Sequence, residues 1–398
     1  MRMRVWIGCL VAGGILGFVQ EGGSVTVFSG TGLGDEERMP DGRASGMGGA
    51  GLAVLDGQNF NRLNPAVLGA FRQPGLSVLF TAQQRVVKDG VVRNRLSEGD
   101  VGHVRLVIPC RNRAVFRVGI EPVTGVNFAY RRVGSNPVEP DTLSLHTRGG
   151  LQALSVGAGA RMMGGRLFLG GGVDAVVIGT IQETWTRTFV NADSLNTLYA
   201  AQDEISRRHR GVQVTMGAAF RSRSGISLGA FFTPRAGLTQ TRVLKTPFGI
   251  TERSQVHVRL PTRFGAGFGY HGADGKWVAA ADLTVSRWRG VDNLIYRDAY
   301  ALSAGISYVT GKEDPLGRSR RIPLRIGASR KTLQYAGLSN RGGAVKETSA
   351  TLGLGIPFRG GWGRFDISLE AGRRGNVQEN GAEEVFFRQT FSIVGWPR

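Results

Sequence analysis

Hydrophobic and polar residues alternate along most of the chain after residue 76. The pattern is clear in three segments, residues 256–270, 321–328 and 364–371. In the last segment, Phe365, Ile367, Leu369 and Ala371 alternate with Arg364, Asp366, Ser368 and Glu370. A period of two places the two sets on opposite faces of a β-strand. One apolar and one polar face is typical of a strand between lipid and a polar barrel lumen.

Segments of this kind, separated by turn-type clusters such as Gly272-Ala273-Asp274-Gly275, predict about fourteen strands. The predicted strands cover 76–87, 101–110, 114–131, 142–162, 165–186, 204–221, 225–242, 253–271, 275–289, 296–310, 319–334, 345–358, 361–374 and 383–396. Residues 192–205 are predicted as a loop with a single helical turn.

Apolar and polar residues alternate both in soluble β-sandwiches and in membrane barrels, and strand length distinguishes the two folds. A soluble sandwich uses strands of about 5–6 residues, whereas about 9–11 residues cross a bilayer, and several segments here exceed both. The aromatic residues predicted at the membrane interface are Trp185, Trp277, Trp288, Tyr300, Tyr308, Trp362 and Trp396. The sequence therefore predicts an all-β transmembrane antiparallel β-barrel of about fourteen strands, the even number that closure needs.

The segment before the strands, residues 41–71, has too much glycine for a stable helix or strand. It nevertheless carries apolar residues, among them Phe60, Leu63 and Leu68, and it contains the triplet Asn64-Pro65-Ala66. Such a segment needs contacts with another part of the protein to keep a fixed structure. We expect it to be a plug inside the barrel.

The order of these motifs resembles the FadL-type outer-membrane transport proteins and the related PorV-like barrels. The resemblance rests on RASGMGGA (residues 43–50), the N-P-A triplet, LPTRFGAGFGY (260–270), KWVAAADLTVSRW (276–288) and EEVFFRQTFSIVGW (383–396). It implies that the N-terminal segment is a hatch that closes the lumen. The implied hatch or gate residues are Gly46, Gly48, Gly49, Phe60, Leu63, Asn64, Pro65, Ala66 and Leu68. Whether the hatch is a fixed stopper or a moving gate stays open.

The N-terminus has the features of an export signal. Arg2 and Arg4 precede an apolar run over residues 5–19, shorter than the ~20 residues of a spanning helix. We therefore expect a signal peptide at 1–20, a hatch at 21–75, a barrel at 76–398, and localisation in the outer membrane of a Gram-negative-type bacterium. The chain ends in Trp396-Pro397-Arg398, an imperfect form of the terminal signal that barrel-insertion machinery recognises.

Composition excludes several other functions. The net charge of +20 comes from basic residues scattered along the strands, without a nucleic-acid motif. Two cysteines, of which Cys9 lies in the predicted signal peptide, define neither a disulfide framework nor a metal site. Motifs such as H-E-x-x-H or C-x-x-C are absent from the sequence. We expect no enzyme, no cofactor and no metal.

The polar strand faces supply candidate ligand-binding residues in the lumen, namely Arg259, Arg263, Arg325, Arg364 and Arg388. Their guanidinium groups have the geometry to hold a ligand carboxylate. The alternative is that they pair with lumen acids such as Asp282, Asp366, Glu370 and Glu384.

The resemblance implies passive uptake of hydrophobic or amphipathic small molecules, such as long-chain fatty acids or hydrocarbons. The alternative is a non-transporting PorV-like barrel that acts as a scaffold or shuttle in protein secretion. A continuous apolar tunnel beside the plug would favour transport, and a packed lumen would favour the scaffold. Expected partners are a hydrophobic ligand, outer-membrane lipid and lipopolysaccharide, and the barrel-insertion machinery, with no nucleic acid; we expect a monomer.

Overall fold

The computed structural model describes residues 26–30, 32–37, 40–89, 93–110, 114–133, 142–190, 198–292, 295–311, 321–338, 343–358 and 362–396. The predicted signal peptide, residues 1–20, lies outside this part of the chain. Among the described residues, no helix combines the length and apolar character needed to cross a membrane.

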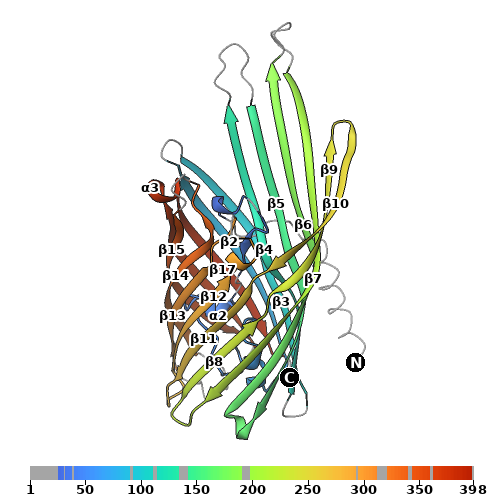
Figure 1. Ribbon diagram of the computed structural model, residues 1–398. Coiled ribbons are helices and arrows are strands. Elements are labelled where there is room, and N and C mark those ends of the chain that lie inside the picture. The colour runs from blue at the N-terminus through green and yellow to red at the C-terminus, as the bar shows by residue number, and fades with distance from the viewer. Residues whose placement is uncertain are drawn as a thin grey trace, which may run out of the picture.

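The wall is one antiparallel sheet that closes on itself, because β17 pairs with β2 from Glu383↔Lys88 to Gly395↔Leu76 (Figure 1). Its strands are β2 (Gly75–Lys88), β3 (Arg93–Cys110), β4 (Ala114–Val133), β5 (Thr142–Met162), β6 (Leu167–Val190), β7 (Leu198–Arg221), β8 (Ile226–Thr233), β9 (Ala236–Thr246), β10 (Gly249–Leu260), β11 (Thr262–His271), β12 (Trp277–Arg287), β13 (Ala299–Thr310), β14 (Ile322–Ala336), β15 (Ala344–Phe358), β16 (Gly363–Asn376) and β17 (Ala382–Gly395). Short helices η3 (Met163–Gly165), η4 (Trp288–Gly290) and α3 (Val377–Asn380) connect some of them.

Two crossings of the wall are interrupted by proline. Pro234 and Arg235 separate β8 from β9, and Pro261 separates β10 from β11. Proline has no N–H to give to the sheet, which explains a break at each point. Each broken pair counts as one crossing, so the barrel has fourteen strands, as the sequence predicts.

The predicted faces are confirmed in β14 and β16. In β14 the side chains of Leu324 and Ile326 are exposed on the outer face, whereas Arg325 is 4% exposed. In β16 Asp366 and Ser368 are buried and Leu369 is exposed.

The predicted faces are wrong for part of residues 256–270, because they exchange at Pro261. Leu260 is 2% exposed in an apolar cluster inside the barrel, and Arg263, beyond the proline, is also buried. Arg259 is exposed, and its neighbour Leu260 faces inward. Successive strand residues point to opposite faces, so Arg259 faces outward, contrary to the expectation that it lines the lumen.

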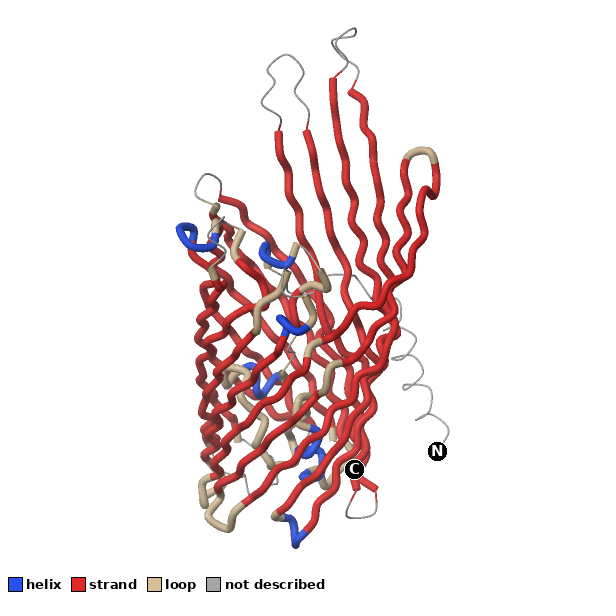
Figure 2. The backbone as a smooth tube through the Cα atoms, viewed as in Figure 1, coloured by secondary structure: helices blue, strands red, loops and turns tan. Residues whose placement is uncertain are grey.

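Two further sequence expectations need correction. Trp288 does not lie at the membrane interface: it is 1% exposed, and its Nε1–H donates to Glu36 Oε2 at 3.2 Å. Of the predicted loop 192–205, residues 198–205 belong to β7. β7 forms a sheet with β4, β5, β6, β9 and β10 that rises well above the rest of the wall (Figure 1 and Figure 2). We call it the tall sheet.

The described residues between Thr26 and Pro74 lie inside the barrel, and we call them the inner segment (Figure 1). Its regular elements are η1 (Val27–Ser29), β1 (Asp35–Glu36), α2 (Gly42–Ser45) and η2 (Pro65–Ala70). β1 pairs with β4, and η2 contacts β4, β5, β6 and β7. The wall strand β2 starts directly after this segment, at Gly75.

Candidate functional site in the lumen

The Asn64-Pro65-Ala66 triplet fixes one corner of the inner segment. Asn64 is fully buried; its Oδ1 accepts from the N–H of Ala66 at 3.1 Å, which caps η2. Its Nδ2 donates to the carbonyl of Leu52 at 2.7 Å and to the wall carbonyl of Ala218 at 3.3 Å. One side chain therefore joins two parts of the inner segment to β7.

Glycines on the inward face of the wall let the inner segment approach closely. A Cβ at Gly170 would overlap the carbonyl group of Pro65, and one at Gly327 would overlap the peptide between Met47 and Gly48. The wall glycines with such contacts are Gly159 on β5, Gly170 on β6, Gly217 on β7, Gly229 on β8, Gly267 on β11, Gly305 on β13, Gly327 on β14 and Gly353 on β15. These strands surround the segment, so it fits the wall by backbone contact over much of the circumference.

Buried arginines hold the turn before the triplet. Arg105 of β3 donates from Nη1 to the carbonyl of Phe60 at 2.7 Å and forms an ion pair with Glu121 of β4 at 3.1 Å. Arg62 of the inner segment reaches the same Glu121 at 3.2 Å and Asp174 of β6 at 3.5 Å. Removing one partner from such a buried network is expected to leave an uncompensated charge.

A second network lies on the opposite part of the wall. Asp366 of β16 pairs with Arg325 of β14 at 2.7 Å and with Arg364 at 2.8 Å. Arg364 also donates from Nη1 to Gln58 Oε1 of the inner segment at 2.6 Å. The Asp366 carboxylate is thus paired with two arginines of the wall and is not available to a ligand.

A third network secures the start of the inner segment. Glu384 of β17 accepts from Thr26 Oγ1 at 2.8 Å and from the N–H of Val27 at 2.7 Å. Arg374 pairs with Glu384 at 2.8 Å and with Glu347 at 2.6 Å, and Lys331 pairs with Glu347 at 2.8 Å.

An apolar cluster also packs the inner segment against the wall. Phe28 and Leu33 of the inner segment pack with residues from many wall strands, including Leu260 and Tyr335. Trp288 and Tyr296 belong to the same cluster, and their rings are in tilted contact with centroids 4.9 Å apart.

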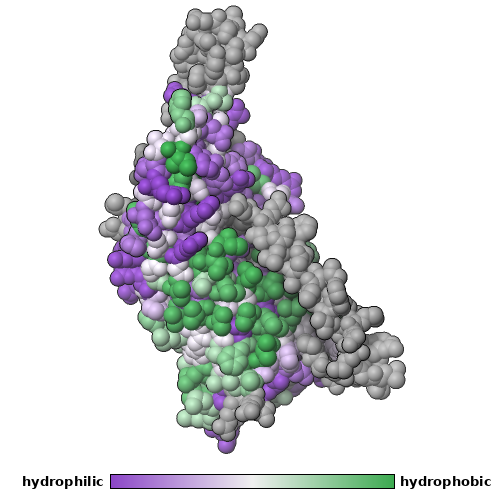
Figure 3. All heavy atoms as spheres, turned by 90° about the vertical axis from the view of Figure 1, so that its right-hand side faces the viewer, coloured by the Kyte–Doolittle hydropathy of each residue, from purple (hydrophilic) through white to green (hydrophobic). Residues whose placement is uncertain are grey.

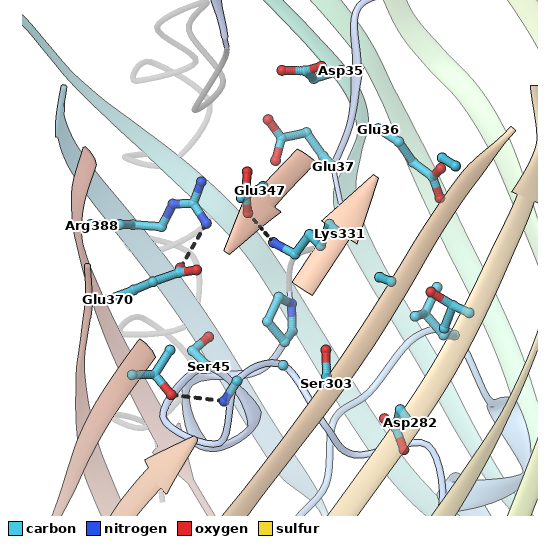
Figure 4. Close-up of a pocket in the computed structure, with 18 of the residues that line it drawn as sticks. Asp35, Glu36, Glu37, Ser45, Asp282, Ser303, Lys331, Glu347, Glu370 and Arg388 are labelled. Atoms are coloured by element: carbon cyan, nitrogen blue, oxygen red, sulfur yellow. Dashed lines mark hydrogen bonds and ion pairs between the residues drawn. The ribbon is translucent and has the colours of Figure 1, made fainter. Parts of the chain in front are cut away.

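A cavity of about 150 Å³ remains between the inner segment and the wall. Ligand pockets usually measure about 300–1,000 Å³. Figure 4 shows its charged lining, with Glu347 toward Lys331 and Glu370 toward Arg388. The size and the charge of this cavity suit ordered water better than a hydrophobic molecule.

Two carboxyl groups of the inner segment line this cavity without belonging to a strand that crosses the membrane. Burial raises the pKa of Asp35 to about 7 and the pKa of Glu37 to about 8. Glu37 Oε1 has no hydrogen-bond partner among the described residues. Both groups bind protons more tightly here than in water.

The predicted lumen arginines fall into two groups. Arg263, Arg325, Arg364 and Arg388 point inward and pair with Glu36, Asp366, Asp366 and Glu370, respectively. Arg259 points outward. The pairing with Asp366 and Glu370 is the alternative named from the sequence, whereas Asp282 instead accepts the N–H groups of Gly51 and Leu52 at 2.6 and 2.9 Å.

The predicted hatch residues lie together in the inner segment. Gly48 and Gly49 have positive φ angles of 69° and 90°, which favour glycine. Phe60 stacks edge-on against Phe71, in a cluster that includes Leu68. Leu63 borders the cavity, and Gly46 approaches Gly353.

Several important side chains were not identified from the sequence. Asp41 accepts from the N–H of Ala44 at 2.7 Å and from the N–H of Phe60 at 2.8 Å, which closes a loop within the inner segment. The position of Asp41 directly before a four-residue helix is a capping signal that the sequence does contain. Arg62 and Glu121 meet only through the fold.

No group of three or more His, Cys, Asp or Glu side chains in the described part of the chain is arranged to hold a metal ion.

A family model described as BamG matches residues 1–394. The chain belongs to the BamG family. No curated protein matches the sequence. Among solved structures, it is similar to the CymD monoaromatic hydrocarbon channel, with a TM-score of 0.56, 15% identity, and coverage of 92% of this chain and 98% of that chain.

Two further structures have the same fold. A Pseudomonas aeruginosa FadL homologue has a TM-score of 0.58 at 13% identity, covering 91% of this chain and 98% of its own. The Ralstonia pickettii toluene transporter TbuX has a TM-score of 0.58 at 14% identity, and the match covers 91% of this chain and 99% of TbuX. The FadL-type resemblance is confirmed: this BamG-family chain has the fold of outer-membrane channels for hydrophobic compounds and is an outer-membrane protein of Gram-negative type.

Proposed function

We propose that this barrel does not transport and that it acts as an outer-membrane scaffold whose inner segment is a fixed part of the structure. The observation that carries the proposal is the filling of the lumen. Glycine contacts, three buried ion-pair networks and an apolar cluster hold the inner segment, and the remaining cavity is small and charged. A hydrophobic ligand would have to displace buried ion pairs, which is unfavourable.

Under this proposal the partners are other proteins of the outer membrane. The family name, BamG, hints at a link to the barrel-insertion machinery, and we include that machinery among the candidate partners. No catalytic step is part of the proposal.

A second candidate is passive uptake of hydrophobic compounds. It is favoured by the similarity in fold to the CymD and TbuX channels. Long-chain fatty acids or hydrocarbons would then be the substrates, and Asn64-Pro65-Ala66 would be the pivot of a gate.

Uptake by proteoliposomes distinguishes the two candidates. The probes are a fluorescent long-chain fatty acid and toluene, and empty vesicles give the baseline. We expect the wild-type barrel to match empty vesicles, because the cavity between the inner segment and the wall is small and lined by charged residues. Uptake above the baseline by the wild-type protein would contradict the scaffold proposal and support the channel.

A loosened variant provides the positive control. Asn64→Ala combined with Pro65→Gly removes the capped corner, so this variant should conduct small ions if the barrel has inserted and folded. Ion conductance in the variant, without conductance in the wild type, would link closure to the inner segment.

A further inference from the structure

The outward face of the tall sheet carries a group of exposed arginines. Arg148 on β5, Arg208 and Arg210 on β7, and Arg259 on β10 are exposed. Buried residues lie beside them in sequence, namely Thr147, His209 and Leu260. Because side chains alternate between the faces of a strand, the four arginines point away from the lumen. We call them the outer arginine cluster.

The sheet register brings three of these arginines around one strand. Arg208 and Arg210 of β7 lie opposite Thr241 and Thr239 of β9, and Arg259 of β10 lies opposite Gly237 of β9. Neighbouring strands are about 4.8 Å apart. Arg210 and Arg259 therefore flank β9 from both sides. A Cβ at Gly237 would meet no heavy atom within 4 Å, so the surface between the two arginines is open.

An apolar surface begins directly beside the cluster on the same face. Continuing along β7, the outward residues after Arg210 are Val212, Val214 and Met216, which are 54%, 39% and 57% exposed. Figure 3 shows this side of the molecule as a hydrophobic band with hydrophilic residues immediately above it. Three large apolar side chains in open contact with solvent are expected where a barrel meets lipid. The cluster thus lies at the edge of the membrane.

These four arginines have no ion pair with a carboxylate among the described residues. Other basic residues of the tall sheet do: Arg207 pairs with Glu183, Arg242 with Glu252 and Lys245 with Glu204. Unpaired guanidinium groups at a lipid boundary present bidentate donors of the kind that bind phosphate.

The cluster lies toward the end of the barrel with the taller strands and the longer connections, such as residues 288–298 between β12 and β13. Most connections at the other end are shorter, such as residues 222–225 and 272–276, and the one between β13 and β14 is the exception. In outer-membrane barrels the longer loops are extracellular. The leaflet beside the cluster is then the outer one.

We propose that the outer arginine cluster is a binding site for the phosphate groups of a phosphorylated glycolipid of the outer leaflet, the lipid A class. Charge complementarity and position at the edge of the apolar band carry the assignment. The site is independent of the lumen, so it holds whether the barrel is a scaffold or a channel.

The test compares lipid affinities of the purified full-length barrel in a neutral detergent. The probes are bisphosphorylated lipid A and its dephosphorylated form, and bound lipid is measured by native mass spectrometry. We expect tighter binding of the phosphorylated form, with a preference that weakens as salt rises. Combined Arg208→Gln, Arg210→Gln and Arg259→Gln should reduce that preference by at least about tenfold, because each basic side chain near an anionic surface contributes to binding.

A matched variant controls for net charge. Arg72→Gln, Arg161→Gln and Arg223→Gln remove the same charge at the short-turn end and should retain the preference. Equal loss in both variants, or equal wild-type affinity for the two lipids, would overturn the proposal. Full competition by millimolar inorganic phosphate would overturn the lipid assignment. Heat-modifiability on gels shows whether each variant has folded. If the triple variant does not fold, the single change Arg210→Gln replaces it, and we expect a smaller loss of the preference for the phosphorylated lipid.

Discussion

At the scale of single residues, the wall glycines give the sharpest prediction about the fit of the inner segment. Gly170→Ala places a methyl group against the carbonyl of Pro65, and such overpacking costs typically 1–3 kcal/mol. We expect the inner segment to become sensitive to protease while the barrel stays heat-modifiable. Gly171→Ala is the matched control, because a Cβ there has its nearest neighbour, Thr215 O, at 3.9 Å. Equal protease resistance in both variants would argue against a close fit.

A second residue-scale prediction concerns the lipid face of β14. Ile326 is 59% exposed on the outer surface. Ile326→Arg should destabilise the barrel by about 2–4 kcal/mol, the range for a charge near the middle of the bilayer. Ile326→Leu should change stability by less than about 1.5 kcal/mol. Urea titration in lipid vesicles measures both, and similar midpoints would place Ile326 outside the bilayer.

At the scale of elements, the alternation of residues predicted the wall well, because the face of a strand depends only on local period. It failed where a proline broke the period. At Pro261 the two faces exchange, so Arg259 and Leu260 lie opposite to their expected sides. Trp288 was misplaced for a different reason: its partner Glu36 is far away in sequence, and no local pattern indicates that contact.

The contents of the lumen were predictable only in outline. Glycine content and the N-P-A triplet indicated a held segment, and the inward arginines were mostly placed correctly. Their partners depend on which strands lie across the lumen from one another. The link from Arg62 to Glu121 and Asp174, for example, joins three elements and exists only in the closed barrel.

The element-scale prediction is that the N-P-A corner anchors the inner segment. Asn64→Ala with Pro65→Gly removes three hydrogen bonds of the Asn64 side chain and frees the backbone. Each buried group left unpaired costs about 1–3 kcal/mol. Hydrogen exchange should rise in residues 40–74 and stay unchanged in β12 to β17, since the wall bonds are made between strands. Exposed Arg72, changed to Ala, is the control and should alter neither region.

At the scale of the whole molecule, the position of Glu37 makes the binding of the inner segment to the barrel wall depend on pH. We call the bound state seated. Burial raises the pKa of this carboxyl group from 4.5 to about 8; the wall cations Arg388 and Arg374 act to lower the pKa, and the acids Asp100 and Asp35 act to raise it. The seated segment therefore binds a proton more tightly than the released one.

The sign of the pH effect follows from this difference in proton affinity. Seating is most stable below about pH 4.5, weakens as pH rises toward 8, and levels off above that value. Proteinase K protection of residues 26–74, measured from pH 5 to 9, should fall across this range in the wild type. Glu37→Gln mimics the protonated group, so its protection should fall less steeply than that of the wild type. The fall that remains comes from Asp35, whose pKa is also raised, to about 7. Glu379→Gln, an exposed change in α3, should follow the wild type. A wild-type profile that is flat, or a Glu37→Gln profile that falls as steeply as the wild type, would show that Glu37 does not control how the segment is held.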